Sequence, residues 1–449
     1  MANTGAPRDA FGTRAGFILA AAGSAVGLGN MWRFSYQASE GGGAAFVLLY
    51  IGMTIVLGIP LMLTEFGIGR RGQSAPVGAL RRVAGPRWAL VGWLGAAGSL
   101  LILSYYSVIA GWTVRYALEA LLVGFPAEAG AHFGSIAAGG GAVGYHLAFM
   151  VLTLLVVLGG IHGGIERVSL ILMPALFVIV IGLALWATTL NGAAAGYSVY
   201  LKPDLDELQN PAVWRAAAAQ AFFSLSLGMG AMMTFASYLD RRANLPESAT
   251  IVSYTDFGVA FVAGLVVFPV IYSLGLQGAV GASTVGALFI ALPGAFDAMG
   301  LVGRVVGSAF FIALVVGALT SAISMLEVVT ASFIDEFKVP RRTAAIVAAV
   351  AAALLGLIPA LDTDALGLMD KIAGEFLLVL GALLLSIIGG WLVRKQMQEE
   401  LTTGASRGWA LQVPRILAVL RFVVPPIVAV VLFFSARETL QTVLAFFRG

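Results

Sequence analysis

Two short polar runs interrupt long apolar segments of this sequence, and both could free backbone groups for binding ions. The first run holds Gly23, Gly27, Gly29 and Asn30, and the second holds Ser224, Ser226, Gly228 and Gly230. An unpaired backbone group in hydrocarbon costs several kcal/mol, so an unwound helix persists only where it lines a cavity or binds something. The alternative is that the glycines are packing faces of intact helices, because small residues let neighbouring helices approach closely.

Three glutamates, Glu65, Glu327 and Glu375, also lie within apolar segments. Carboxylates inside a membrane are costly and are usually functional. Of the three, we assign only Glu327, as a partner for the freed backbone of the interrupted helices.

The remaining reactive side chains do not indicate an enzyme. The chain has no cysteine, which excludes disulfides and thiolate metal sites. His132, His146 and His162 lie in or beside predicted loops, with no carboxylate cluster at ligand spacing. We therefore do not expect a metal-centred active site.

The elements that must position these residues are membrane helices. Of the 449 residues, 59% are hydrophobic and only 11% are charged, against about 25% charged in an average soluble protein. The formal net charge of +3 is too small and too scattered for binding nucleic acid. The composition predicts an all-α polytopic membrane protein embedded in the lipid bilayer.

A helix needs about 20 mostly apolar residues to cross the hydrocarbon core. Eleven transmembrane helices are predicted, near residues 15–36, 43–67, 88–122, 144–160, 168–189, 213–238, 248–279, 302–333, 343–359, 368–393 and 413–436. Cationic residues follow the even-numbered helices: Arg70, Arg71, Arg81, Arg82, Arg87, Arg167, Arg241, Arg242, Lys338, Arg341, Arg342, Arg394 and Lys395. Because cationic loops stay inside the cell, we expect a cytoplasmic amino terminus and a multi-pass protein of the plasma membrane.

The two interruptions lie in the first and the sixth predicted helices. Interruptions at corresponding positions of two halves indicate a transporter built from inverted repeats, with its site at the membrane midplane. We therefore predict one transmembrane domain over residues 1–449 with a 5+5 inverted repeat. Its parts are repeat one at about 11–190, repeat two at about 211–395 and an extra helix at about 413–436.

Four stretches resemble the signatures of the neurotransmitter:sodium symporter family. The run from Gly23 to Phe34 resembles the first-helix signature, and the run from Ser224 to Gly230 resembles that of the sixth helix. Gly317-Ala318-Leu319-Thr320-Ser321 and Asp335-Glu336-Phe337 resemble the eighth-helix region. The resemblance implies the LeuT-type fold, with broken helices 1 and 6, and a transport protein rather than an enzyme.

The resemblance also implies an amino-acid site. It assigns the carboxylate to the freed amides of Leu28 and Gly29 with the Tyr106 hydroxyl, since helix amino termini favour anions. The ammonium group would be received by Ala25, Phe223, Ser224 and Ser226, and the side chain by Ile102, Phe223, Met229, Ser321 and Met325. Amine transporters of the family have an aspartate where this chain has Gly27, which favours whole amino acids. Methionines fit irregular groups, so we expect large neutral side chains.

Two sodium ions are expected from the same resemblance, because hard cations prefer oxygen ligands. The first sodium site would use Ala25, Asn30, Ser224 and Asp256 together with the substrate carboxylate. The second would use Gly23, Val26, Gly317, Thr320 and Ser321. Hydrogen bonding of Thr320 and Ser321 to preceding helix carbonyls is the alternative.

The family's gates correspond to two charge pairs here. Arg33 and Asp370 match the outer pair, with Tyr106 and Phe223 as a lid over the substrate, and Arg8 and Asp335 match the inner pair. Each of these residues could instead be an interfacial charge in water.

Asp256 also predicts independence of chloride. Tyr50 and Ser224 match two chloride-binding positions of animal relatives, but Asp256 replaces a neutral asparagine and Ala260 replaces a serine. A fixed carboxylate supplies the negative charge that chloride would bring.

The sequence thus predicts a sodium-coupled symporter that imports a neutral hydrophobic or aromatic L-amino acid by alternating access, without chloride. A proton-coupled amino-acid carrier of the same fold is the alternative. An intramembrane enzyme would need a catalytic dyad or a metal cluster within the helices, and a channel would not need paired breaks. The oligomeric state stays open.

Overall fold

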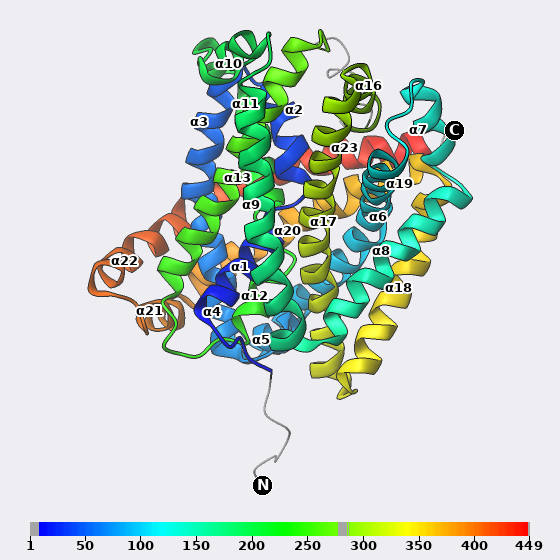
Figure 1. Ribbon diagram of the computed structural model, residues 1–449. Coiled ribbons are helices and arrows are strands. Elements are labelled where there is room, and N and C mark those ends of the chain that lie inside the picture. Colours follow the sequence, from blue (N-terminus) through cyan, green and yellow to red (C-terminus); the bar gives the residue numbers. More distant parts are fainter. Residues whose placement is uncertain (1–8, 277–284, 286, 448–449) are drawn as a thin grey trace.

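The structure is a computed structural model that describes residues 9–276, 285 and 287–447. Within these ranges the regular secondary structure is helical, apart from an isolated bridge between Gly43 and Pro203. Figure 1 shows most of the long helices aligned along one axis as a bundle, with α1 beginning near one end of it. The predicted all-α polytopic architecture is confirmed.

The first half of the chain, from residue 9 onward, contains ten α-helices and four short η segments, which are π or 3₁₀ turns. In order they are α1 Arg14–Ala25, η1 Gly29–Arg33, α2 Phe34–Glu40, α3 Ala44–Met53, η2 Thr54–Gly58, α4 Ile59–Gly72, α5 Pro76–Val83, η3 Pro86–Trp88, α6 Ala89–Leu122, α7 Ala129–Ile136, α8 Gly140–Leu158, η4 Ile161–Glu166, α9 Arg167–Ala187 and α10 Ala193–Leu201.

The described part of the second half also consists of α-helices joined by short η segments. Its elements are η5 Asp206–Gln209, α11 Pro211–Ser224, α12 Ala231–Ala236, α13 Leu245–Ser273, η6 Ala287–Ala291, α16 Leu292–Ala298, α17 Gly300–Phe337, α18 Arg341–Leu361, α19 Thr363–Asp370, η7 Lys371–Leu377, α20 Leu378–Ile387, η8 Ile388–Leu392, α21 Arg394–Thr402, α22 Arg407–Phe422 and α23 Val424–Phe446.

Nine helical segments of the described chain are long and apolar enough to cross a membrane, or ten with the bent pair Arg14–Ala25 and Gly29–Glu40. This pair is the predicted first span, and the helix is bent by 64° between its two halves. The predicted sixth span is divided into α11 and α12, which have only 14 and 6 residues. The protein is therefore a multi-pass membrane protein, while the count of eleven stays a prediction.

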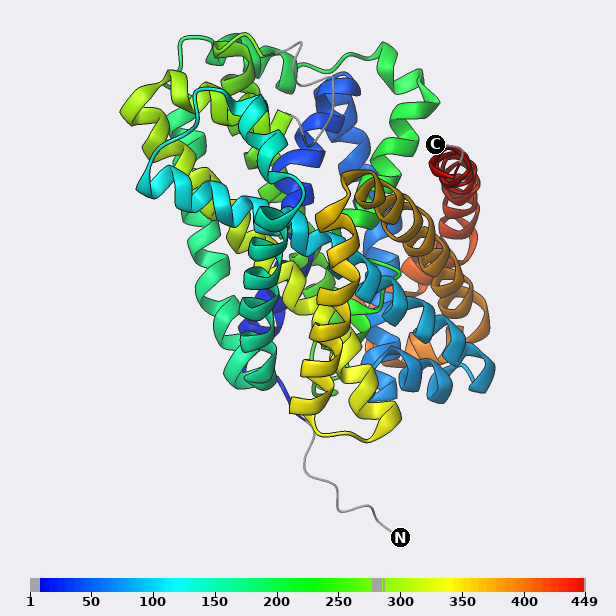
Figure 2. The ribbon, with the colours of Figure 1, turned by 90° about the vertical axis from the view of Figure 1, so that its right-hand side faces the viewer.

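The centre of the bundle is built on two long helices, α6 and α17, which pack along each other. α8 and α18 pack against both of them, and Figure 2 shows these four helices side by side. The broken helix α1 packs against α17, α13 and α9, while α12 packs against α4. Both interruptions therefore lie inside the bundle, within reach of α6 and α17.

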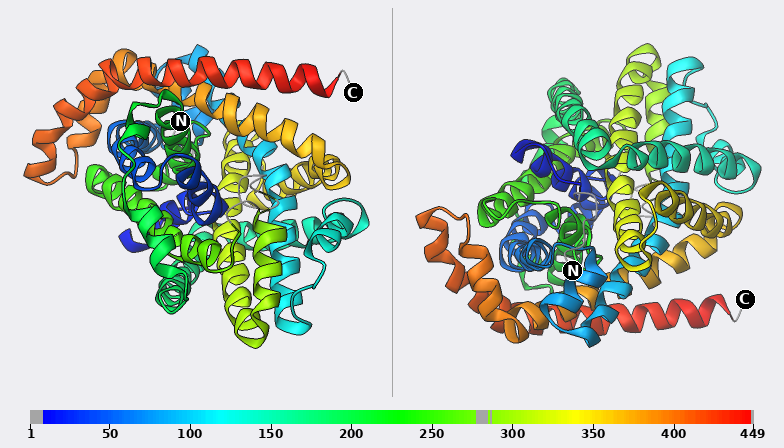
Figure 3. Two further views of the ribbon diagram at one scale, coloured as in Figure 1. Left: turned by 90° about the horizontal axis from the view of Figure 1, so that it is seen from above. Right: turned by 90° about the horizontal axis from the view of Figure 1, so that it is seen from below.

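The predicted last span, 413–436, is part of a longer helical segment that breaks at Val423. The break precedes Pro425 and Pro426, and proline cannot donate a helical hydrogen bond. Figure 3 shows α23 as one long straight helix when the bundle is seen along its axis. α23 thus runs across the bundle, and it packs on η7 and α20.

The cationic connections lie at the same end of the bundle as the amino terminus. Figure 1 shows the carboxyl end of α4, the short helix α5, α12 and the turn between α17 and α18 at this end. Arg70 and Arg71 end α4, and Arg81 and Arg82 end α5.

Candidate functional site

The first interruption is formed by residues Val26 to Leu28. Val26 leaves the helical region, with ψ at 108°, and ends α1. The freed amide of Gly27 donates to Oδ1 of Asn30 at 2.9 Å. A Cβ added at Gly27 would lie 2.6 Å from Ser321 Oγ and 3.0 Å from the Tyr106 hydroxyl. A larger residue here would have to displace these two hydroxyl groups, because the unwound backbone lies directly against α6 and α17.

The second interruption, between α11 and α12, depends on left-handed backbone. Ser226, Gly228 and Gly230 have φ values of +53°, +91° and +81°, and glycine adopts this region without a Cβ penalty. The Ser226 hydroxyl donates to the Ser24 carbonyl at 2.8 Å. The two broken helices are thus joined directly at their breaks.

Glu65 holds the freed backbone of the second interruption. This buried carboxylate of α4 accepts hydrogen bonds from the amides of Gly228 at 2.7 Å and Met233 at 3.2 Å. The prediction that Glu327 has this role is wrong. Glu327 instead accepts from the Tyr238 hydroxyl at 2.7 Å and pairs with Arg341 at 2.5 Å, since its position on α17 faces α18 and not the break.

A small pocket lies between the two breaks. It is lined by Ser24, Ala25, Gly27, Leu28, Gly29, Asn30, Ile102, Tyr106, Phe223, Ser224, Ser226, Met229, Ser321 and Met325. Every residue predicted to bind substrate is in this lining. Its cavity measures only about 30 Å³, which leaves room for only about two or three water molecules. Binding of anything larger therefore requires the walls to move apart.

The pocket has a polar and an apolar part. The Leu28 amide donates to the Tyr106 hydroxyl at 3.4 Å, and this amide begins the η1 helix, where an anion is favoured. Phe223 covers Gly29 so closely that a Cβ on Gly29 would lie 2.9 Å from the ring. The guanidinium of Arg33 lies 4.5 Å from the centre of the same ring. Phe223 thus separates the pocket from the charged region above it.

Three residues of the predicted first sodium site form one hydrogen-bonded cluster. Asp256, fully buried in α13, accepts from Asn30 Nδ2 at 2.6 Å, Ser224 Oγ at 2.8 Å and the Tyr50 hydroxyl at 2.8 Å. No lysine or arginine of the described ranges pairs with this carboxylate. An ionised buried carboxylate needs a cation, and the cluster therefore suits a small metal cation. Binding it through Asn30 Oδ1 requires the Asn30 amide to turn over.

The residues of the predicted second sodium site meet where α1 approaches α17. Ser321 Oγ lies 3.3 Å from the carbonyl oxygens of Gly23 and Val26. Thr320 Oγ1 lies 3.1 Å from the Gly317 carbonyl and 3.2 Å from that of Val316. Thr320 thus bonds back to its own helix, while Ser321 reaches across to span 1.

The outer charge pair differs from the prediction. Arg33 lies 4.0 Å from Glu375, whereas Asp370 accepts from the Tyr105 hydroxyl at 2.8 Å. Asp370 ends α19 beside α6, where Tyr105 reaches it, and Glu375 lies one turn later in η7, facing Arg33. The carboxylate that pairs with Arg33 within 4.0 Å is therefore Glu375, and the role of Arg33 and Asp370 as the outer gate stays a prediction.

Of the predicted inner pair, Arg8 lies outside the described residues. Asp335, near the end of α17, accepts from the Ser74 hydroxyl at 2.8 Å and from the Ala75 amide at 2.6 Å. It therefore fastens the amino terminus of α5 to α17.

Sequence reasoning missed two further residues of the site. Gln220 is buried and donates from Nε2 to the Gly29 carbonyl at 3.3 Å, and Ser24 donates to Ser324 at 2.7 Å. The sequence did contain one indication for Gln220. It is a side-chain amide within an apolar helix, one turn before Ser224.

Comparison with known proteins gives a consistent result. Residues 8–133 and 131–445 match the profile of the Sodium:neurotransmitter symporter family. An uncharacterized sodium-dependent transporter of Bacillus subtilis, YhdH, is 36% identical over 438 residues, which cover 93% of this chain and 96% of that protein. The rat sodium-dependent neutral amino acid transporter B(0)AT2 is 32% identical over 300 residues, covering 59% of this chain and 41% of that protein.

A solved structure is also similar over nearly the whole chain. The crystal structure of MhsT in complex with L-phenylalanine superimposes with a TM-score of 0.85 at 40% sequence identity. The match covers 96% of this chain and 100% of that one. The ligand bound in that structure is an amino acid.

Proposed function

Because the chain belongs to the sodium:neurotransmitter symporter family, we propose that it imports a neutral hydrophobic or aromatic L-amino acid together with sodium by alternating access. The observation that carries this proposal is the pocket between the two breaks. Its lining combines freed amides, carbonyls and hydroxyls with apolar side chains, and it holds each residue expected to contact substrate.

The pocket supports an amino acid as substrate. The amide of Leu28 and the hydroxyl of Tyr106 lie together, which suits a carboxylate at a helix amino terminus. Ile102, Met229 and Met325 line the other part, with no charged side chain to hold a lysine or glutamate substrate. The similar protein MhsT has been solved in complex with L-phenylalanine, an amino acid of this kind.

Two sodium ions would travel with the substrate. The cluster around Asp256 supports the first site, where the substrate carboxylate would complete the ligand set and couple the two cargoes. The carbonyls of Gly23 and Val26 around Ser321 support the second. This second ion would tie the broken span 1 to α17, so that its release loosens the contact.

Chloride is not required in this scheme. The Tyr50 and Ser224 hydroxyls, which match chloride-binding positions of relatives, both donate to Asp256. The carboxylate thereby supplies the negative charge next to sodium.

The proposal includes the topology. The two breaks favour the division into repeats at about 11–190 and 211–395, with the helical segment after Arg407 outside the repeats. The cationic connections at the amino-terminal end favour a cytoplasmic amino terminus, in the plasma membrane, and an outward-facing entrance above Phe223.

Uptake into proteoliposomes tests the function. We expect accumulation of labelled leucine driven by an inward sodium gradient and unchanged when gluconate replaces chloride. Tryptophan and leucine should compete strongly and glutamate negligibly. Accumulation driven by a proton gradient without sodium would support the proton-coupled carrier instead, and preferential competition by glutamate would refute the substrate class.

A further inference from the structure

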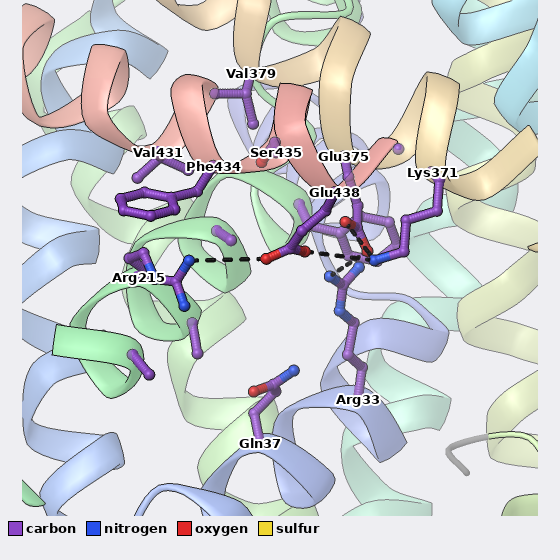
Figure 4. Close-up of a pocket in the computed structure, with 15 residues that line it drawn as sticks. Arg33, Gln37, Arg215, Lys371, Glu375, Val379, Val431, Phe434, Ser435 and Glu438 are labelled. Carbon is purple, nitrogen blue, oxygen red and sulfur yellow. Dashed lines mark hydrogen bonds and ion pairs between the residues drawn. The ribbon is translucent and has the colours of Figure 1, made fainter. Parts of the chain in front are cut away.

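A second cavity lies directly above the substrate pocket, on the other side of Phe223. It measures about 220 Å³ and is bounded by α11, η7, α23 and the carboxyl-terminal part of span 1. Five charged side chains surround it: Arg33, Arg215, Lys371, Glu375 and Glu438. Figure 4 shows these side chains pointing toward one another across the cavity.

The five charges form a chain of alternating sign. Arg33 lies 4.0 Å from Glu375, and Glu375 lies 2.8 Å from Lys371. Lys371 lies 3.7 Å from Glu438, which lies 3.7 Å from Arg215. This row of five charges therefore connects the broken span 1, which carries Arg33, with the broken span 6, which carries Arg215.

Two of these ion pairs cross the cavity and the others do not. α23 packs on η7 and α20, and the Thr439 hydroxyl donates to the Lys371 carbonyl at 3.1 Å. Glu438, Lys371 and Glu375 therefore belong to one wall. The Arg33–Glu375 pair joins this wall to span 1, and the Arg215–Glu438 pair joins it to span 6.

We propose that Glu438 is a positioning residue that holds the broken span 6 closed over the substrate pocket, as Glu375 holds the broken span 1. Lys371 lies between the two carboxylates and keeps them from repelling each other, so that both pairs can form together. This inference rests on the proposed alternating access, because an amino acid reaching the pocket must pass between α11 and this wall. The Arg215–Glu438 pair must then break.

The size of the effect follows from exposure. The five charged side chains around the cavity are between 20% and 50% exposed. Ion pairs between side chains with this exposure are individually weak. Loss of the Glu438 charge should therefore shift the balance between closed and open vestibule by about two- to fivefold, rather than lock the transporter.

A single introduced cysteine can report on this balance, since the chain has none of its own. Ala219 lines the cavity on α11, one turn after Arg215 and one turn before Phe223. In the Ala219→Cys protein, labelling by an uncharged, membrane-impermeant maleimide should be about two- to fivefold faster when Glu438→Gln is added. Arg437→Gln is the matched control. Arg437 is exposed on the same helix, and no ion pair joins it to another described residue.

Exchange of the charges separates a pairing role from a merely structural one. Glu438→Arg and Arg215→Glu should each speed labelling, and the two together should return the rate toward that of the parent. A cysteine at exposed Ala212, at the rim, should be labelled equally in all variants. An unchanged rate in Glu438→Gln, or a double variant as fast as the single ones, would overturn the inference. If sodium and amino acid fail to alter labelling of the parent, alternating access is wrong, while the ratio between Glu438→Gln and parent still decides the role of Glu438.

Discussion

The hydroxyl of Tyr50 in α3 donates a hydrogen bond of 2.8 Å to Oδ2 of Asp256 in α13. Ser224 in α11 donates to the same carboxylate at 2.8 Å, so three helices meet at one buried charge. The carboxylate is satisfied by neutral donors and has no cationic side chain beside it within the described chain. Its charge is therefore available to a cation bound between spans 1, 6 and 7.

We expect Asp256→Asn to abolish transport or to make it depend on chloride. The amide keeps the size of the side chain but removes the negative charge, so a bound sodium ion would lack a fixed counter-charge. Uptake into proteoliposomes with chloride or gluconate as the anion measures this. Asp297→Asn, at an exposed position, is the control. A fall in wild-type uptake on removal of chloride would contradict this role of Asp256.

Replacing both Thr320 and Ser321 by Ala should leave the fold largely intact and abolish sodium-driven accumulation. The two hydroxyls lie next to carbonyls of α1 and α17, where the second sodium ion is proposed. Gel filtration checks folding, and uptake against a sodium gradient checks coupling. Concentrative uptake at the wild-type level in the double variant is incompatible with this assignment.

Gly27→Ala should strongly impair transport. The added methyl group would lie 2.6 Å from Ser321 Oγ, so it must displace either the unwound backbone of span 1 or the serine proposed to bind sodium. Gly98→Ala is a matched control, because a Cβ at Gly98 of α6 meets no atom within 4 Å. Equal uptake by the two variants would show that the close approach at Gly27 is dispensable.

Glu65→Gln should reduce stability by about 1–3 kcal/mol, the cost of leaving a buried amide without its acceptor. A glutamine has only one acceptor oxygen, whereas Glu65 uses both of its oxygens on the amides of Gly228 and Met233. Thermal unfolding in detergent measures the loss. Glu128→Gln, at an exposed position, should leave the melting temperature unchanged, and the same result for Glu65 would argue against its role.

The sequence by itself determined the helical class, the two interruptions and most of the pocket. These features are local, because apolar segments of sufficient length form spans and the glycines at 228 and 230 permit the left-handed backbone that the second break adopts. The residues predicted to bind substrate lie close to the breaks or on α6 and α17, so a motif match was sufficient to predict that they line one pocket.

Tertiary structure decided which charges meet. Glu65 and Glu327 are both carboxylates in apolar helices, but only the first faces the freed amides, at 2.7 Å from Gly228. Arg33 lies 4.0 Å from Glu375, which η7 carries. Asp370 instead accepts a hydrogen bond from the Tyr105 hydroxyl of α6. The kink before Pro425 leads α23 across the bundle and brings Glu438 to 3.7 Å from Arg215. Hydrogen bonds and ion pairs require contact within a few ångströms, and such distances depend on how helices far apart in the chain are rotated and packed.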